Sequence, residues 1–133
     1  MPSSRVFDSW AILAFLQREP AGPVVRSLII EAAEAGAEMW ITAVNLGEVW
    51  YNLARRRSDS EADAAVADLE RIGFQVRSID WDLARQAAVY KARHALAYAD
   101  CFAAALAKQL KVELVTGDRE FKKLEKEVKI RWV

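Results

Sequence analysis

The segment Tyr98-Ala-Asp-Cys-Phe-Ala-Ala-Ala-Leu-Ala-Lys-Gln-Leu-Lys-Val-Glu-Leu-Val-Thr-Gly-Asp118 decides the fold of this chain. Its alanine-rich first part predicts a helix over residues 98–110. The largely apolar run at residues 112–115 predicts a strand that follows this helix almost at once. A helix that leads directly into a short apolar strand is typical of a parallel sheet covered by helices on both faces.

The same alternation of short apolar runs and helical segments extends over the whole chain. Strands are expected at residues 5–7, 39–41, 74–79, 112–115 and 128–132, the last at an edge of the sheet. Helices are expected at residues 10–16, 24–35, 44–56, 60–72, 80–94, 98–110 and 118–126, with Thr42, Ser60 and Asp80 as N-caps. The pattern predicts a single α/β domain over residues 1–133. It has three layers, α/β/α, with a mostly parallel sheet of four to five strands and about seven helices.

The composition of the chain excludes several classes of protein. The 133 residues include 19 Lys and Arg against 19 Asp and Glu, so any nucleic-acid binding must come from a local basic patch. A single cysteine excludes an internal disulfide and a cysteine-based zinc site. No apolar run is long enough to span a membrane, and Met1 to Arg5 is too short and polar for a signal peptide. We therefore expect a cytoplasmic protein with no membrane partner.

Two acids directly follow expected strands. Asp8 comes after the strand at residues 5–7, and Asp118 comes after the strand at residues 112–115. Ligands of parallel sheets bind at the carboxyl ends of the strands, near the point where strand order reverses. If these two strands are neighbours, both carboxylates lie in one crevice.

Two further acids lie in apolar surroundings. Glu48 lies within an apolar helical segment, where Asn45, Glu48 and Asn52 form one polar stripe. Asp100 is the only charged residue in the run from Tyr98 to Ala107, and its helix face continues with small alanines. No Lys or Arg within that run neutralises Asp100.

Burying a charged carboxylate without a partner destabilises the fold, and several buried carboxylates together repel one another. A divalent cation would resolve this conflict, and carboxylate ligands without His or Cys suit Mg²⁺ or Mn²⁺ better than zinc. Such a metal can activate water and stabilise charge on a phosphodiester. The residues alone therefore favour phosphodiester hydrolysis.

Four motifs in order resemble those of one protein family. They are Phe7-Asp8-Ser9-Trp-Ala-Ile-Leu13, Thr42-Ala-Val-Asn-Leu-Gly-Glu48-Val, Tyr98-Ala-Asp100-Cys-Phe-Ala-Ala-Ala-Leu-Ala107 and Leu114-Val-Thr116-Gly-Asp118-Arg-Glu-Phe121. The chain resembles PIN-domain ribonucleases over nearly its whole length, and VapC-type toxins of prokaryotic toxin–antitoxin pairs most of all.

The resemblance implies a Mg²⁺- or Mn²⁺-dependent endoribonuclease of PIN-like fold. The catalytic, metal-binding acids would be Asp8, Glu48, Asp100 and Asp118, with Asp8 and Asp100 as the main ligands. Supporting residues of the active site would be Ser9, Thr42, Asn45 and Thr116. The implied partners are an RNA substrate, a cognate antitoxin and a second copy of the chain in a homodimer. The chain departs from many relatives at Ala97, where they have a residue that caps the helix of Asp100.

Other residues leave alternatives open. Arg119, Lys122 and Lys123 follow Asp118 and are candidates for contacts with RNA phosphates. The lone His94 has no metal-ligand companions, which argues against a histidine-based ribonuclease mechanism. One alternative function is a catalytically silent PIN-like module that binds RNA or protein. Another is a phosphotransferase with Asp8 as nucleophile, which the absence of a second acid two residues later disfavours.

Overall fold

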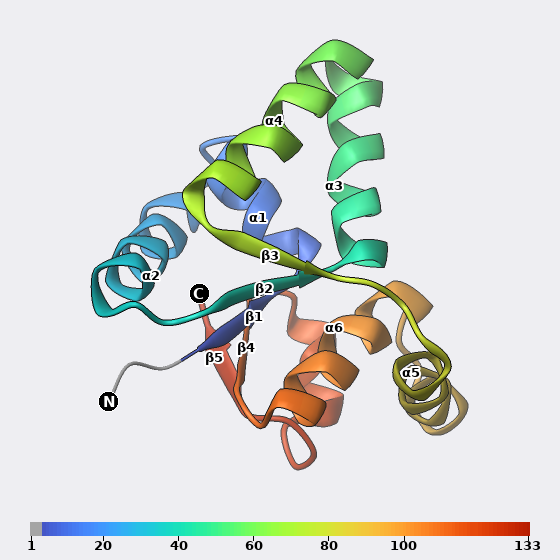
Figure 1. Ribbon diagram of the computed structural model, residues 1–133. Helices are drawn as coiled ribbons and strands as arrows, with labels where there is room; N and C mark the ends of the chain where they lie inside the picture. Colours follow the sequence, from blue (N-terminus) through green and yellow to red (C-terminus); the bar gives the residue numbers. More distant parts are fainter. Residues whose placement is uncertain (1–3) are drawn as a thin grey trace.

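The computed structural model describes residues 4–133. The prediction that Met1 to Arg5 is no signal peptide therefore falls partly on residues outside the described ones. Five strands form one fully parallel sheet in the order β3-β2-β1-β4-β5 (Figure 1). They are β1 (Arg5–Phe7), β2 (Met39–Thr42), β3 (Phe74–Arg77), β4 (Glu113–Thr116) and β5 (Ile130–Trp132). The predicted α/β/α fold with a parallel sheet is confirmed.

Helices cover both faces of this sheet (Figure 1). One layer consists of α1 (Ser9–Leu16), α2 (Gly22–Ala35), α3 (Ala43–Arg56) and α4 (Asp59–Ile72). The other consists of α5 (Trp81–Arg93), α6 (Tyr98–Leu110) and the short 3₁₀ helix η1 (Arg119–Leu124). Among residues 4–133, no helix has the length and apolar character that a membrane crossing requires.

Each face of the sheet has its own hydrophobic core because successive strand residues point to opposite faces. Val6 and Leu114 pack in the core beneath α5 and α6, whereas Phe7 and Val115 pack in the core beneath α1 to α4. All four side chains are fully buried. The short apolar strands are therefore buried on both sides, as expected for a parallel sheet.

Most predicted element boundaries are correct within a few residues, and the caps Thr42 and Asp80 are confirmed. The prediction of Ser60 as the N-cap of α4 is wrong. Ser58 is the N-cap, and its hydroxyl accepts a hydrogen bond from the amide of Glu61 at 3.1 Å. Strand β3 ends at Arg77 rather than Ile79. The segment after Asp118 forms a 3₁₀ helix instead of an α-helix.

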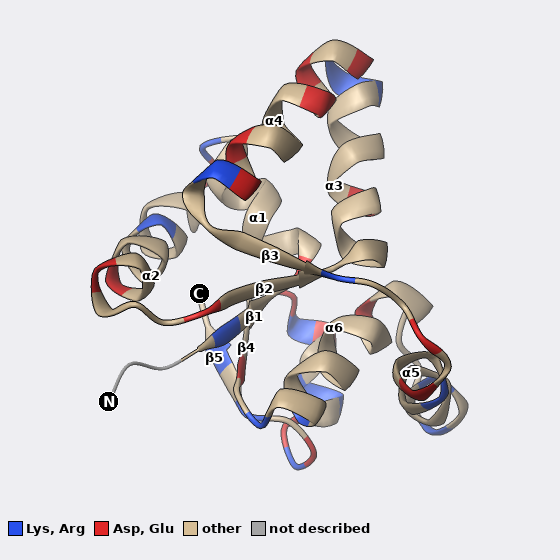
Figure 2. Ribbon diagram, viewed as in Figure 1, with Lys and Arg blue, Asp and Glu red and all other residues tan. Residues whose placement is uncertain are grey.

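The strand order sets the position of the two acids that follow strands. Strand β1 pairs with β2 on one side and with β4 on the other. The order of the strands therefore reverses between β1 and β4, which is where parallel sheets bind ligands. Both signs of charge are spread over the helices and loops on each side of the sheet (Figure 2).

Candidate active site

Asp8 is the most deeply buried of the four predicted acids, with 1% of its surface exposed. It is the N-cap of α1, and its Oδ1 accepts a hydrogen bond from the amide of Ala11 at 2.8 Å. Its Oδ2 accepts a second hydrogen bond from the Thr116 hydroxyl at 2.5 Å. These two bonds hold the carboxylate in one orientation at the end of β1.

The hydroxyl of Thr116 connects the acid that follows β1 with the acid that follows β4. Besides donating to Asp8, its Oγ1 accepts a hydrogen bond from the amide of Asp118 at 3.0 Å. Asp118 in turn caps η1, because its Oδ1 accepts from the amide of Glu120 at 3.0 Å. The buried hydroxyl of Thr116 thus donates one hydrogen bond and accepts another, and its supporting role in the active site stays a prediction.

Glu48 is held by two polar neighbours. Its Oε1 accepts hydrogen bonds from the Ser9 hydroxyl at 2.8 Å and from the side-chain amide of Asn45 at 3.3 Å. Ser9 is the first residue of α1, directly after Asp8. The structure therefore brings Glu48 on α3 next to the beginning of α1.

Asn45 is fully buried and links three elements of the site. Its side-chain oxygen and backbone amide both bond to the hydroxyl of Thr42, the N-cap of α3. Its Nδ2 donates to Glu48 and also to the backbone oxygen of Ala99 at 3.1 Å. Because Ala99 precedes Asp100, Asn45 fixes the beginning of α6 relative to α3.

Asp100 lies in the first turn of α6, partly buried. Among residues 4–133, no side chain or amide donates a hydrogen bond to its carboxylate, and Ala97 supplies no side-chain cap to the helix. Burial, together with the smaller effects of the charges of Asp118, Glu48 and Glu120, raises the pKa of Asp100 to about 7.

Burial also raises the pKa of Asp8 to about 7, although the hydrogen bonds from Thr116 and Ala11 oppose the shift. The nearby charges of Asp100 and Asp118 add to it. Asp100 is therefore within electrostatic range of each of the other three predicted acids. Glu120, which also acts on Asp100, was missed in the sequence because it reads as a surface residue of a charged helix.

The oxygens of these acids suit a hard divalent cation by their chemistry. The carboxylate of Asp100, which lacks hydrogen-bond donors within the described chain, is the donor group most in need of such a cation. Among residues 4–133, however, no three His, Cys, Asp or Glu side chains stand close enough together to hold a metal ion. The ligand types thus fit Mg²⁺ or Mn²⁺, and the assignment of the four acids as metal ligands stays a prediction.

Comparison with known protein families identifies the fold. Residues 5–127 match the sequence profile of the PIN domain. The chain belongs to the PIN domain family. No curated protein matches it in sequence.

Solved structures resemble this PIN domain along almost its full length. The sarcin-ricin loop cleaving toxin VapC20 of Mycobacterium tuberculosis is 23% identical, with a TM-score of 0.70 over 90% of this chain and 94% of that one. A chain of DNA-bound VapBC from Salmonella typhimurium is 17% identical, with a TM-score of 0.80 over 97% of each chain. A chain of FitAcB from Neisseria gonorrhoeae is 21% identical, with a TM-score of 0.71 over 95% of each chain. At these identities the likeness is one of fold.

The raised pKa values predict how the stability of the metal-free PIN domain depends on pH. An acid whose pKa is higher in the folded state binds more protons there, so the free energy of unfolding falls as pH rises between about 4 and 7. We expect the melting temperature in EDTA to decrease from pH 5 to pH 8. Added Mn²⁺ should raise it more at pH 8 than at pH 5, because protons compete with the metal. Thermal unfolding monitored by circular dichroism measures both, and an equal Mn²⁺ effect at the two pH values would contradict this expectation.

Gly117 lies between Thr116 and Asp118 and packs against the indole ring of Trp10. A Cβ atom at Gly117 would lie 2.2 Å from the Cη2 atom of Trp10, far inside contact distance. The glycine therefore allows the loop of Asp118 to approach α1 closely, and Trp10 covers this loop.

We expect Gly117→Ala to lower the free energy of unfolding by about 2 kcal/mol, because the rigid ring must move. In a Trp10→Leu background the same change should have a much smaller effect. Gly47→Ala is the matched control, since nothing lies within 4 Å of a Cβ at that position on α3. It should stabilise the protein by about 0.5–1 kcal/mol. Urea unfolding measures the free energy of unfolding of Gly117→Ala, Trp10→Leu, the double variant and Gly47→Ala. If Gly117→Ala lowers this free energy equally with Trp10 and with Leu at position 10, the proposed contact is refuted.

The three predicted basic residues after Asp118 differ in their surroundings. Lys123 donates hydrogen bonds to the backbone oxygen of Ala95 at 2.7 Å and to Glu120 at 2.5 Å, so it ties η1 to the loop before α6. The guanidinium of Arg119 lies over the ring of Trp132. Lys122 is exposed. An RNA-binding role for these residues stays a prediction.

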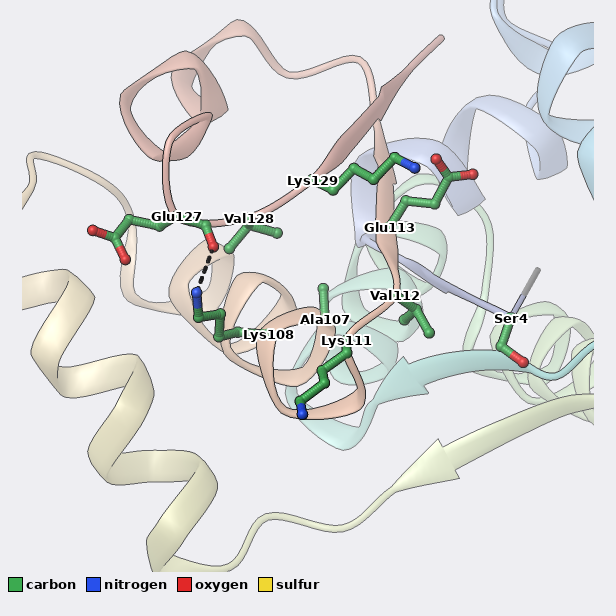
Figure 3. A pocket seen from close by; sticks show the side chains of 9 residues that line it. All are labelled: Ser4, Ala107, Lys108, Lys111, Val112, Glu113, Glu127, Val128 and Lys129. Atoms are coloured by element: carbon green, nitrogen blue, oxygen red, sulfur yellow. Dashed lines mark hydrogen bonds between the residues drawn. The ribbon is translucent and has the colours of Figure 1, made fainter.

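A hollow of about 910 Å³ lies at the opposite edge of the sheet from the acids (Figure 3). It is lined by the end of α6, the beginning of β4 and the segment before β5. Lys108 points across it and donates to the backbone oxygen of Glu127 at 3.1 Å, as Figure 3 shows. Lysines at the end of a helix are favoured by the helix dipole, which explains Lys108 and Lys111 without a ligand.

Proposed function

We propose that this PIN domain is a metal-dependent endoribonuclease and the toxin of a toxin–antitoxin pair. The observation that supports this most is the electrostatic interaction of Asp100 with Asp8, Glu48 and Asp118, two of which follow the strands between which the strand order reverses. Within residues 4–133, none of these acids forms a salt bridge, so their charge is left for a ligand to neutralise. Similarity in fold to a toxin described as cleaving the sarcin-ricin loop supports RNA as the substrate.

In this proposal Asp8 and Asp100 would hold a Mg²⁺ or Mn²⁺ ion, with Glu48 and Asp118 acting partly through water. The bound metal would activate a water for attack on the phosphodiester and offset the charge of the transition state. Thr116 favours the ionised form of Asp8 by donating to it. Ser9 and Asn45 orient Glu48, leaving its Oε2 free to act toward the site.

The proposed partners are a cognate antitoxin and a second copy of the chain. Among the proteins that share the fold, VapBC-5 of Mycobacterium tuberculosis is described as a member of the VapBC family of toxin–antitoxin systems, and another structure as a toxin–antitoxin complex from Klebsiella pneumoniae. Large apolar side chains remain exposed on this chain, with 70% of the surface of Trp81 accessible. Exposed apolar surface is typical of protein interfaces. With an RNA substrate and such a partner, we expect the protein to act in the cytoplasm.

Cleavage of RNA by the purified protein tests the proposed activity. We expect cleavage with Mn²⁺ or Mg²⁺ and none in EDTA, and the products should lack 2′,3′-cyclic phosphates because water, not the 2′-hydroxyl, is the nucleophile. Cleavage in EDTA or cyclic phosphate ends would overturn the metal-dependent mechanism. Binding of RNA without any cleavage would support the silent RNA-binding module instead.

A further inference from the structure

Arg77, at the end of β3, and Arg119, directly after Asp118, each have a guanidinium that lies over a tryptophan ring. The guanidinium of Arg77 lies 4.7 Å from the ring centre of Trp40. The guanidinium of Arg119 lies 5.1 Å from the ring centre of Trp132. An arginine held flat on an aromatic ring loses less conformational freedom when its donors bind a ligand.

Apart from the contact with its tryptophan, neither guanidinium has an ionic or hydrogen-bond partner in the described part of the chain. Within residues 4–133, Arg77 and Arg119 form no salt bridge and donate no side-chain hydrogen bond. This differs from Arg5, which binds both Glu31 and Glu113 at the opposite edge of the sheet. The donors of Arg77 and Arg119 are therefore available to an anion, and their planar geometry suits phosphate.

The sheet places these arginines on either side of the acids. Arg77 is the last residue of β3 and pairs in register with Thr42 at the end of β2. Arg119 directly follows Asp118. Since all strands are parallel, the backbone of both arginines lies at the carboxyl edge of the sheet. The side chain of Arg77 extends from there over Trp40 of β2. Strands β2 and β1 lie between β3 and β4, so the ends of β3 and β4 are about 14 Å apart across three strand spacings.

A polyanion that approaches four carboxylates needs cations beside them, because the acids repel its phosphates. We propose that Arg77 and Arg119 bind phosphates of the RNA strand on the two sides of the scissile bond. Trp40 and Trp132 are positioning residues that hold the two guanidiniums in place. This inference rests on the proposed ribonuclease function and adds a substrate-binding residue, Arg77, on the side of the acids opposite to Arg119.

A third stacked pair supplies a matched control. The guanidinium of Arg55 lies 4.9 Å from the ring centre of Tyr51, near the far end of α3. Arg55 is about 18 Å along the helix from Ala43, where α3 begins beside the sheet. If stacking alone made an arginine bind RNA, Arg55 would do so as well.

The test measures binding of a labelled single-stranded RNA of random sequence by fluorescence anisotropy, in EDTA, at KCl concentrations between about 50 and 200 mM. We expect Arg77→Gln to raise Kd about tenfold. It should also reduce the slope of log Kd against log[KCl] by about 0.7, the value for one phosphate contact. Arg119→Gln should do the same, and the double variant should show both losses. Arg77→Lys should keep most of the slope, and Trp40→Leu should weaken binding only when Arg77 is present.

The outcomes separate this inference from the proposed function. An unchanged Kd and slope for Arg77→Gln, or an equal loss for Arg55→Gln, would overturn the inference even if the wild-type protein cleaves RNA. Failure of the wild-type protein to bind RNA would overturn it as well. Loss of binding at Arg77 in a protein that does not cleave RNA would support the inference and overturn the nuclease proposal. Thermal unfolding of each variant verifies that the fold is intact.

Discussion

Replacing Asp100 by Asn is expected to reduce Mn²⁺-dependent RNA cleavage by more than about 100-fold, because the variant loses a main metal ligand. The same change should raise the melting temperature of the metal-free protein at pH 8 by several degrees. Loss of activity together with a gain of stability is the signature of a charged group kept for function at the cost of stability.

The gain in stability follows from the pKa of Asp100. Its value of about 7 in the folded protein exceeds the ordinary value of 3.8, so ionisation of Asp100 at pH 8 destabilises the fold. Asn has nearly the same shape and carries no charge, and about 2 kcal/mol of destabilisation should be relieved. The difference in melting temperature between the variant and the wild type should shrink as pH falls from 7 toward 4, because Asp100 is then protonated in the folded protein. It should vanish below the ordinary pKa of 3.8, where Asp100 is neutral in the unfolded chain as well.

Asp82→Asn is the control for this experiment. Asp82 also lies in the first turn of a helix, but it is exposed and belongs to α5. We expect this variant to keep wild-type cleavage and to lose slightly in stability, since an acid at a helix N-terminus is favourable. Cleavage by Asp100→Asn at the wild-type rate would remove Asp100 from the metal site. A lower melting temperature of Asp100→Asn at pH 8 would contradict the electrostatic account.

Replacing Thr116 by Val is expected to impair both stability and activity. The hydroxyl of Thr116 donates to Asp8 and accepts from the amide of Asp118, and all three groups lie at the switch point of the sheet. Val has the same shape but leaves a buried carboxylate and an amide short of one partner each. The free energy of unfolding should fall by about 2–4 kcal/mol.

The cleavage activity of Thr116→Val should fall about 10- to 100-fold, and its pH profile should shift toward higher pH. The hydrogen bond from Thr116 lowers the pKa of Asp8, so its loss raises that pKa and keeps Asp8 protonated over a wider range. The measurement is the pH profile of Mn²⁺-dependent cleavage with urea unfolding alongside. Thr116→Ser is the control, because it keeps both hydrogen bonds and loses only a methyl group. A pH profile of Thr116→Val that matches the wild type would refute the proposed role of this hydroxyl.

The sequence determined the fold class and the four candidate acids. Short apolar strands that alternate with helices predict a parallel sheet with helices on both faces. Asp8 and Asp118 stand out because each directly follows a strand. Local signals were less reliable at element ends. Ser58 and Ser60 are each followed three residues later by an acid, so the capping pattern did not distinguish them, and Ser58 is the N-cap in the folded chain.

Only the tertiary structure decided which residues support those acids. Thr116 binds Asp8 across 108 residues of sequence, and Asn45 reaches Ala99 across 54. The close approach of Trp10 to Gly117 and the stacking of Arg77 on Trp40 likewise depend on which strands are neighbours. Hydrophobic periodicity and caps act over a few residues, so the sequence pattern could specify the elements and their faces. The order β3-β2-β1-β4-β5, which places the acids beside their supporting residues and the two arginines on either side of them, is set by the packing of the whole chain.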